Sequence, residues 1–372
     1  MALESPNIFI TLFAFIILIG TLVIIHELGH YWVGRWFGVK AEKFSVGFGP
    51  QLWGRTDKRG TLWRIGALPL GGYVQFAGDM NPASQPSEEW LNLSEEERNQ
   101  TFQSKTLWQR ALIVFAGPAI NFLFAILLLS GFLITYGQVT SPPIASMVQA
   151  GSAAEKAGIE VGDRIMSING RNVDTFQELA TEVSIYAKER VTLRIKRGSG
   201  ISEKQVVLDE LIEKDRFGNE YRRGLLGIQS MESEIRSVGI IEAPWLATKE
   251  TANIVRLTVT SLGQIITGKR SVKELGGPAK IAKVAGEHFV LGLAAFIWLA
   301  AMISINLGFM NLLPIPMLDG GHLLLYGIEA VRRKPATPMV QEWAFRAGFL
   351  MLVGFMLVVT FNDLVSFGLF AG

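Results

Sequence analysis

The apolar residues of this chain are gathered in long uninterrupted blocks. No charged residue falls between Ile8 and Ile25, between Ala111 and Tyr136, or between Phe289 and Leu313. Each block approaches the roughly 20 residues that an α-helix needs to span the hydrocarbon core of a bilayer. A fourth, shorter block from Ala347 to Phe361 continues past two polar residues into Val365 to Phe370. The pattern predicts a multi-pass α-helical membrane protein with four transmembrane helices.

The composition agrees with this class and excludes others. Apolar residues make up 49% of the 372 residues and charged residues only 18%, against roughly 25% charged in soluble domains. The net charge of +2 gives no indication of a nucleic-acid partner. Because there is no cysteine, disulfides, thiolate metal ligands and cysteine catalysis are excluded. The first block lacks the basic start and the cleavage site of a signal peptide, so we expect an uncleaved helix.

Basic residues indicate the orientation of the spans. Seven Lys and Arg residues lie between positions 35 and 64, and Arg332, Arg333 and Lys334 precede the fourth block. By the positive-inside rule both segments face the cytoplasm. We therefore expect both termini, and the long segment between the second and third spans, on the outer side of the membrane.

The outward segment, residues 139–231, has the pattern of a small soluble α+β domain. Short alternating runs bounded by turn residues predict its strands and helices. The strands are expected at Ile144–Val148, Arg164–Ile168, Val191–Lys196, Gln205–Leu211 and Leu225–Gln229, and the helices at Ala153–Ala157 and Phe176–Ala187.

Residues 157–170 of this segment, Ala-Gly-Ile-x-x-Gly-Asp-x-Ile-x-x-Ile-Asn-Gly, resemble the signature of PDZ domains in the circularly permuted order common in bacteria. PDZ domains bind the carboxylate of a peptide C-terminus with backbone N–H groups of a glycine-flanked loop, and the peptide adds as an edge strand. The residues that match this loop are Gly224, Leu225, Leu226, Gly227 and Ile228. The alternative is a domain without a peptide ligand that acts as a spacer or size filter.

The main chemical motif, His26-Glu27-Leu28-Gly29-His30, stands at the inner end of the first span. Residues four apart share one face of a helix, so both imidazoles can bind one metal ion while the glutamate reaches a bound water. Ionisable residues at the end of an apolar span are costly and generally mark function. The alternative is an interfacial helix end whose histidines only meet water.

A catalytic zinc usually has three protein ligands and one open position. Without cysteine, the residues alone leave His288, His322 and carboxylates at the same depth as candidates for the third ligand. Asp319 follows the third span, which runs in the same direction as the first, so it returns to the leaflet of the two histidines. Pro314 and Pro316 interrupt the helix there, which is tolerated at membrane depth only where the backbone lines a cavity or packs in protein.

Three motifs together resemble the site-2 protease family of intramembrane zinc metalloproteases. They are the residues 26–30 in the first span, Phe115-Ala-Gly-Pro-Ala-Ile-Asn-Phe in the second, and Asn311-x-x-Pro-x-Pro-x-Leu-Asp-Gly-Gly-His after the third. The nearest branch is the bacterial regulator of sigma-E protease, whose best-known members carry tandem PDZ domains where this chain has room for one. The resemblance implies Zn²⁺ bound by His26, His30 and Asp319, with Glu27 as the catalytic acid/base.

The resemblance also implies a place and a substrate class. The enzyme would lie in the bacterial inner membrane, with the PDZ domain and both termini periplasmic and the active site towards the cytoplasmic side. Its partners would be the lipid bilayer and single-pass membrane proteins, such as anti-sigma factors after a first cut or remnant signal peptides. It would cleave their transmembrane segments.

Two further segments are interpreted through the same resemblance. Residues 44–74 are expected to form a membrane-associated β-hairpin or sheet whose edge pairs with an extended substrate, the alternative being a loop that only seals the site. Asn311 is expected to contact substrate, the alternative being that it satisfies the broken helix. Asn121 is expected to pack helices together, as Asn commonly does in membranes.

We therefore expect four parts: residues 1–138 with two spans, the metal motif and the β region; 139–231 as the PDZ domain; 232–288 as a linker with an amphipathic helix; and 289–372 with two spans and the Asp319 motif. Two functions other than proteolysis remain as alternatives. One is a membrane-anchored peptide-binding adaptor with a structural metal. The other is a transporter, which should show repeated halves that this sequence lacks.

Overall fold

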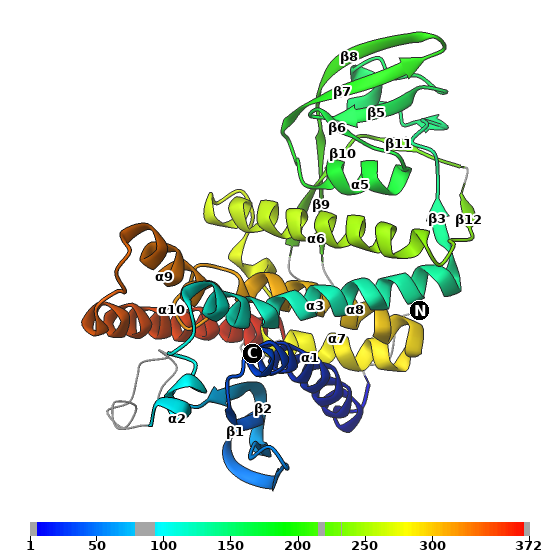
Figure 1. Cartoon of the computed structure of the whole chain (residues 1–372). Coiled ribbons are helices and arrows are strands. Elements are labelled where there is room, and N and C mark those ends of the chain that lie inside the picture. The colour runs from blue at the N-terminus through cyan, green and yellow to red at the C-terminus, as the bar shows by residue number, and fades with distance from the viewer. Residues whose placement is uncertain (1–5, 79–93, 215–219, 232, 368–372) are drawn as a thin grey trace. The chain divides into compact units, whose positions relative to one another are not determined.

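The computed structural model describes residues 6–78, 94–214, 220–231 and 233–367 (Figure 1). The chain divides into two compact units, each built from several segments. The first consists of Met1–Ser130, Pro244–Val255 and Gly276–Asp363, and the second of Gly131–Ala243, Arg256–Leu275 and Leu364–Gly372.

Within the described residues, four helices are long and apolar enough to cross a membrane: α1 (Ile8–Trp36), α3 (Leu107–Tyr136), α8 (Leu293–Asn311) and α10 (Pro338–Ser366). Each predicted span therefore contains a long helix, and residues 368–370 of the fourth lie outside the described residues. The predicted start of the third span at Phe289 is wrong, because Phe289 belongs to the preceding helix α7 (Pro278–Val290). Gly292 separates the two helices with a φ of +107°, a conformation that only glycine adopts easily.

The described residues of the first unit form two apolar cores. In one, α1 packs against α7 and α8 through Leu18, Leu22, Ala285 and Leu299. The other joins α1, the β region, α3 and the short helix α9 (Asp319–Arg332). Its members are Tyr31, Val39, Ala41, Phe44, Phe76, Phe102, Ile113, Val114 and Tyr326. This second core holds together the elements that carry the chemical motifs.

The expected β region between residues 44 and 74 contains two long strands, β1 (Ala41–Thr56) and β2 (Leu62–Phe76), which pair with shifts of register. Residues 43–46 pair with 72–75 on one side and with 62–65 on the other. Residues 72–76 thus have their strand partner on one side, and no described strand borders their other edge. The helix α2 (Glu95–Asn99) follows before α3.

The second unit holds a small α+β domain, which we call the inserted domain (residues 139–231). A four-stranded sheet has the order β6 (Arg171–Asn172), β5 (Arg164–Ile168), β7 (Arg190–Arg197), β8 (Gly200–Val207). Three pairs accompany it: β9 (Asp209–Lys214) with β10 (Glu220–Leu225), β4 (Met147–Val148) with β11 (Ile228–Gln229), and β3 (Gln138–Thr140) with β12 (Glu234–Arg236).

The helices α4 (Ala153–Lys156), α5 (Phe176–Ser184) and α6 (Glu242–Ile266) lie near the predicted positions. Three predicted strands are wrong in extent. The run Gln205–Leu211 forms β8 and β9, because the chain breaks at the buried Leu208. The run Leu225–Gln229 is interrupted at Gly227, whose φ of +83° turns the chain. Of Ile144–Val148, only the last two residues form a strand.

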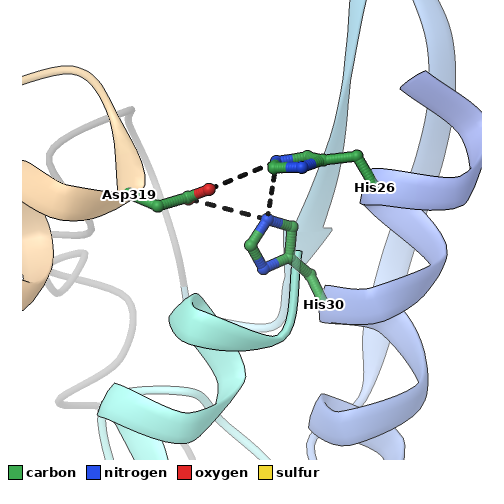
Figure 2. Close-up of side chains that lie close together, drawn as sticks. All are labelled: His26, His30 and Asp319. Carbon is green, nitrogen blue, oxygen red and sulfur yellow. Dashed lines mark hydrogen bonds and ion pairs between the residues drawn. The ribbon is translucent and has the colours of Figure 1, made fainter. Parts of the chain in front are cut away.

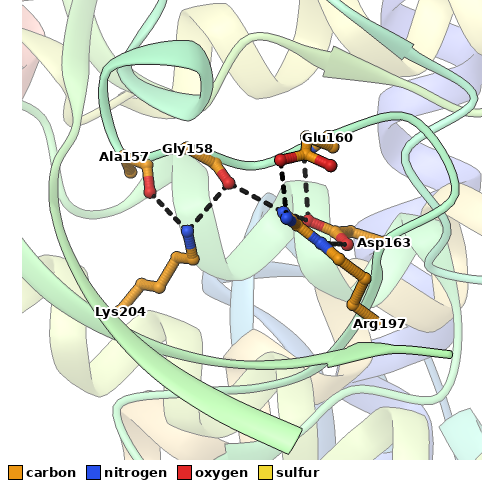
Figure 3. A network of polar contacts seen from close by, with 6 residues as sticks. All are labelled: Ala157, Gly158, Glu160, Asp163, Arg197 and Lys204. Carbon is orange, nitrogen blue, oxygen red and sulfur yellow. Dashed lines mark hydrogen bonds and ion pairs between the residues drawn. The ribbon is translucent and has the colours of Figure 1, made fainter. Parts of the chain in front are cut away.

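A polar network fixes the loop that resembles the PDZ signature (Figure 3). Arg197 of β7 donates from Nε and Nη2 to the two carboxylate oxygens of Asp163, at 2.7 and 2.8 Å. It also donates to Glu160 and to the Gly158 carbonyl, and Lys204 donates to the carbonyls of residues 157 and 158. Asp163 is only 1% exposed. The hydrogen bonds from Arg197 hold the pKa of the Asp163 carboxyl below its ordinary value.

Asp163→Asn is expected to lower the free energy of opening this loop by about 2 kcal/mol, since a buried carboxylate loses its charged hydrogen bonds to Arg197. Because the folded pKa of Asp163 lies below the unfolded value of about 3.9, its contribution is full above that value and is lost as pH falls through the folded pKa. Amide hydrogen exchange of residues 157–163 in the full chain measures both effects. Glu160→Gln is the control, since this exposed partner should contribute under about 1 kcal/mol. Equal effects of the two variants would contradict the prediction.

Candidate metal centre

Three of the predicted site residues meet at one point of the first unit. α1 presents His26 and His30 from successive turns, and Asp319 is the first residue of α9; Figure 2 shows the three side chains pointing toward one another. His26 Nε2 lies 3.2 Å from Asp319 Oδ2, and His30 Nε2 lies 3.5 Å from Asp319 Oδ1. The two Nε2 atoms are 3.2 Å apart. Residues almost 300 positions apart in sequence thus form one compact group.

This group fits a zinc ion by its distances and by its donor atoms. Tetrahedral zinc with ligand bonds of about 2.0–2.1 Å places its ligand atoms about 3.3 Å apart, which is the spacing seen here. Asp319 Oδ2 is buried and, within the described part of the chain, has no hydrogen-bond partner. A bound cation would satisfy this acceptor. Two imidazoles and one carboxylate also leave a fourth position open, as catalytic zinc sites do.

The other ring nitrogen of each histidine faces α3. His30 Nδ1 donates to the Ile113 carbonyl at 2.8 Å, which leaves the Nε2 lone pair directed at the group. His26 Nδ1 lies 3.1 Å from Asn121 Nδ2. The backbone carbonyl of Asn121 accepts a hydrogen bond from Ser304 Oγ of α8, so it is the backbone of this residue that links the two helices. The contact between the Asn121 side chain and His26 was not predicted from the sequence. A polar residue within an apolar span was the feature that pointed to such a role.

Glu27 and strand β2 line the same cavity as the group. The cavity has a volume of about 710 Å³, and its wall includes residues 71–76 of β2. Glu27 is 8% exposed. A Cβ atom added to Gly72 would lie 3.0 Å from Glu27 Cγ and 2.8 Å from the Ser45 carbonyl oxygen, so β2 passes directly beside the glutamate. An acid/base residue, the metal group and a strand edge therefore share one cavity.

The remaining predicted residues have different surroundings. Asn311 ends α8 and lines the cavity. His322 also lines it, but its ring packs beside Phe345 at a centroid distance of 5.1 Å and lies outside the metal group. His288 lies on α7, where its Nδ1 contacts the Val284 carbonyl at 2.9 Å.

The loop of residues Gly224, Leu225, Leu226, Gly227 and Ile228 lies in the inserted domain. Leu226 is 3% exposed and packs in the core of that domain, so its side chain is not available to a ligand. The carbonyls of Leu226 and Gly227 accept from Ala154 and Gln149. The predicted loop is shorter than expected, because Gly224 and Leu225 belong to β10 and Ile228 to β11, which leaves only Leu226 and Gly227 between strands.

Gly117 permits α3 to approach the two histidines. A Cβ atom at this position would lie 2.2 Å from His30 Nε2 and 2.9 Å from His26 Cε1. Gly117→Ala is expected to displace the imidazoles and weaken zinc binding by about 10- to 100-fold, the equivalent of an overpacking cost of about 1–3 kcal/mol. Gly131→Ala on the same helix is the control, since no described heavy atom lies within 4 Å of its added Cβ. Competition with a chromogenic zinc chelator measures the affinity, and equal affinities of the two variants would refute the packing argument.

Known proteins resemble this chain over nearly its full length. The model of peptidase family M50 matches residues 14–355, which include every member of the metal group and Glu27. "Putative zinc metalloprotease Atu1380" of Agrobacterium fabrum is 40% identical over 357 residues, covering 95% of both chains. Metalloprotease MmpA of Caulobacter vibrioides is 35% identical over 387 residues, covering 97% of both chains.

The PDZ domain of an SdrC-like protein from Listeria monocytogenes is among the solved structures that match. It is 20% identical, covers 26% of this chain and 92% of its own, and has a TM-score of 0.18. The assignment of the inserted domain therefore rests on its own sequence signature. The match to the family model and the relatives of about 40% identity show that the chain belongs to peptidase family M50, the site-2 proteases, and is an integral membrane zinc metalloprotease.

Proposed function

We propose that this metalloprotease cleaves peptide bonds within the transmembrane segments of single-pass membrane proteins, with zinc held by His26, His30 and Asp319. The observation that carries the proposal is the metal group itself. The donor atoms of its three residues lie 3.2–3.5 Å apart in one cavity with Glu27, and two of the residues stand on a helix apolar enough to span a membrane.

When bound, zinc supplies a Lewis acid that polarises the scissile carbonyl and increases the acidity of water. Glu27 accepts the proton of the attacking water and delivers it to the leaving amine. The burial of Glu27 beside β2 limits the directions in which its carboxylate can point. His30 keeps its Nε2 lone pair toward the group because its Nδ1–H is bonded to the Ile113 carbonyl.

A transmembrane substrate must be unwound before cleavage, because a helix keeps its peptide bonds occupied with internal hydrogen bonds. We propose that the unwound segment pairs with the edge of residues 72–76. This edge is supported by a strand on its other side and lines the cavity next to Glu27. Main-chain pairing of this kind accepts many sequences. Asn311, on the same cavity wall, is proposed to hydrogen-bond the extended substrate backbone.

We further propose that the enzyme lies in the bacterial inner membrane with its active site towards the cytoplasm. The basic residues between positions 35 and 64 support this orientation, which makes the inserted domain and both termini periplasmic. The substrates proposed are membrane remnants left by a first outside cut, such as anti-sigma factors or signal peptides. The inserted domain, whether by bulk or by its loop 224–228, is proposed to select them.

The metal centre can be tested by elemental analysis of the purified full chain. About one zinc per chain is expected, the number that a single catalytic site holds. His26→Ala, His30→Ala and Asp319→Ala should each lower the occupancy, whereas His288→Ala, which removes a histidine outside the group, should not. Retained zinc in Asp319→Ala with loss in His322→Ala would move the third ligand to His322.

A further inference from the structure

We propose that α3, which contributes no ligand, fixes the positions of all three zinc ligands, with Asn121 and the Arg110–Glu329 ion pair as its positioning residues. This inference rests on the proposed zinc centre. It follows from contacts that reach each of the three ligands separately, two directly and one through the helix that bears the ligand. The first contact, from the Ile113 carbonyl to His30, is made by the backbone of α3.

The second contact involves the side chain of Asn121. His26 Nε2 faces Asp319, so a metal-binding His26 uses the Nε2 lone pair and carries its proton on Nδ1. That proton needs an acceptor. Asn121 is fully buried, and its Oδ1 has no hydrogen-bond partner among the described residues. Rotating the amide by half a turn places Asn121 Oδ1 where Nδ2 now faces His26 Nδ1, at 3.1 Å. In that orientation the His26 Nδ1–H donates to Asn121 Oδ1.

The third contact acts on Asp319 through α9. Arg110 Nη2, near the start of α3, lies 2.8 Å from Glu329 Oε1 on α9, and the two side chains are only 16% and 19% exposed. The guanidinium also lies over the ring of Tyr326, 5.0 Å from its centroid, on the same helix. Glu329 is about 15 Å along α9 from Asp319. Because a helix is stiff over this length, holding Glu329 against α3 limits where Asp319 can lie.

The three contacts come from one face of a single helix, since Ile113 follows Arg110 by about one turn and Asn121 follows Ile113 by about two turns. Arg110, Ile113 and Asn121 are spaced so that α3 runs along the whole group, and Gly117 between them brings its backbone against both imidazoles. Outer partners of this kind orient ligating histidines and carboxylates, and removing one typically costs about 10- to 100-fold in metal affinity. A merely structural role would lower stability without changing the zinc affinity of the folded protein.

The Asn121 step is tested with matched variants of the full-length protein in detergent. Asn121→Leu removes the acceptor at nearly constant volume, and Asn121→Asp keeps it. We expect zinc affinity, measured by chelator competition, to fall about 10- to 100-fold in Asn121→Leu and to stay within a few-fold of wild type in Asn121→Asp. The visible spectrum of the Co²⁺-loaded protein should change in Asn121→Leu alone. Ser304→Ala removes the neighbouring α8–α3 hydrogen bond and should leave affinity and spectrum unchanged.

The ion-pair step is tested by charge reversal. Arg110→Glu and Glu329→Arg each place like charges together and should weaken zinc binding about tenfold or more. The double variant restores the pair and should recover most of the affinity. The exposed Arg346–Glu342 pair of α10 is the control, since reversing either of its charges should not change zinc binding. Unchanged affinity in the single variants, or no recovery in the double variant, would overturn this step.

His26→Ala separates the failure of this inference from that of the proposed centre. If His26→Ala keeps its zinc, the proposed centre is wrong and the inference is overturned with it. If His26→Ala loses zinc while Asn121→Leu binds as wild type, the centre stands and Asn121 is not a positioning residue. If Asn121→Leu does not fold, a tenfold loss of affinity in Asn121→Asp overturns the role of the acceptor, and wild-type affinity supports it.

Discussion

Glu27→Gln is expected to retain a full complement of zinc and to lose cleavage by about 10³-fold or more, at the upper range of general acid/base contributions. The amide occupies nearly the same volume beside Gly72, so the cavity wall should not move. It cannot accept the proton of the attacking water, and it cannot return a proton to the leaving amine. Single-turnover cleavage of a fluorescent transmembrane reporter in liposomes, with zinc measured on the same preparation, checks both parts.

The control is Glu42→Gln, which removes an exposed carboxylate from β1 in the same unit. Its cleavage rate should equal that of wild type. Glu27→Asp is a useful intermediate, because it keeps a base one methylene short of its position and should retain part of the activity. Turnover by Glu27→Gln at the wild-type rate would refute the mechanism, and loss of zinc in that variant would show that Glu27 acts on the metal site instead.

The metal group is the part of the site that the sequence predicts best. Its first two residues follow from helix periodicity alone, because positions 26 and 30 must share one face. Counting membrane crossings returns both Asp319 and His322 to the leaflet of the two histidines, and the choice of Asp319 as third ligand rests on the resemblance to the site-2 proteases. Such arguments place the residues at one membrane depth and on one helix face. The distances of 3.2–3.5 Å between their donor atoms depend on how the helices pack.

The contributions of α3 could not be predicted in the same way. An Asn in an apolar span is compatible with helix packing and with a role at the site, and only the contact with a histidine 95 positions away distinguishes them. Gly117 likewise resembles any small residue at a helix crossing. Its role depends on the two imidazoles that stand within 3 Å of its absent Cβ.

The exact ends of helices and strands could not be predicted from the hydrophobic pattern either. The apolar run from Phe289 onward continues through Gly292, where the helix breaks, because hydrophobicity reports burial in lipid or protein and not backbone direction. In the inserted domain, the run Gln205–Leu211 contains no Gly or Pro, and its one turn-type residue, Asp209, was not enough to predict the break at Leu208. Strand termini of this kind are set by pairing partners that are distant in sequence.

Removing the inserted domain tests how the enzyme selects substrates. The ends of the domain are held together, because β3 pairs with β12 and Thr140 lies opposite Glu234. Residues 141–233 can therefore be replaced by a two-residue Asn-Gly turn, which suits an antiparallel pair, without stretching the flanking strands. Pairs of this kind lie about 5 Å apart, well within the reach of such a turn. The remaining membrane unit keeps every residue of the metal group.

We expect the domain to act as a size filter, since cleaved remnants of many sequences are more easily selected by size than by sequence. The deletion should then raise cleavage of a substrate with its outer domain intact several-fold, while a trimmed substrate is cut about as before. Capture of new C-termini by residues 224–228 gives the opposite result, a slower cut of the trimmed substrate. Amidating that C-terminus should also weaken its binding to the intact enzyme, because the loop loses an anionic acceptor for its N–H groups. Both substrates are compared in one membrane preparation, and unchanged selectivity after deletion would reject the filter.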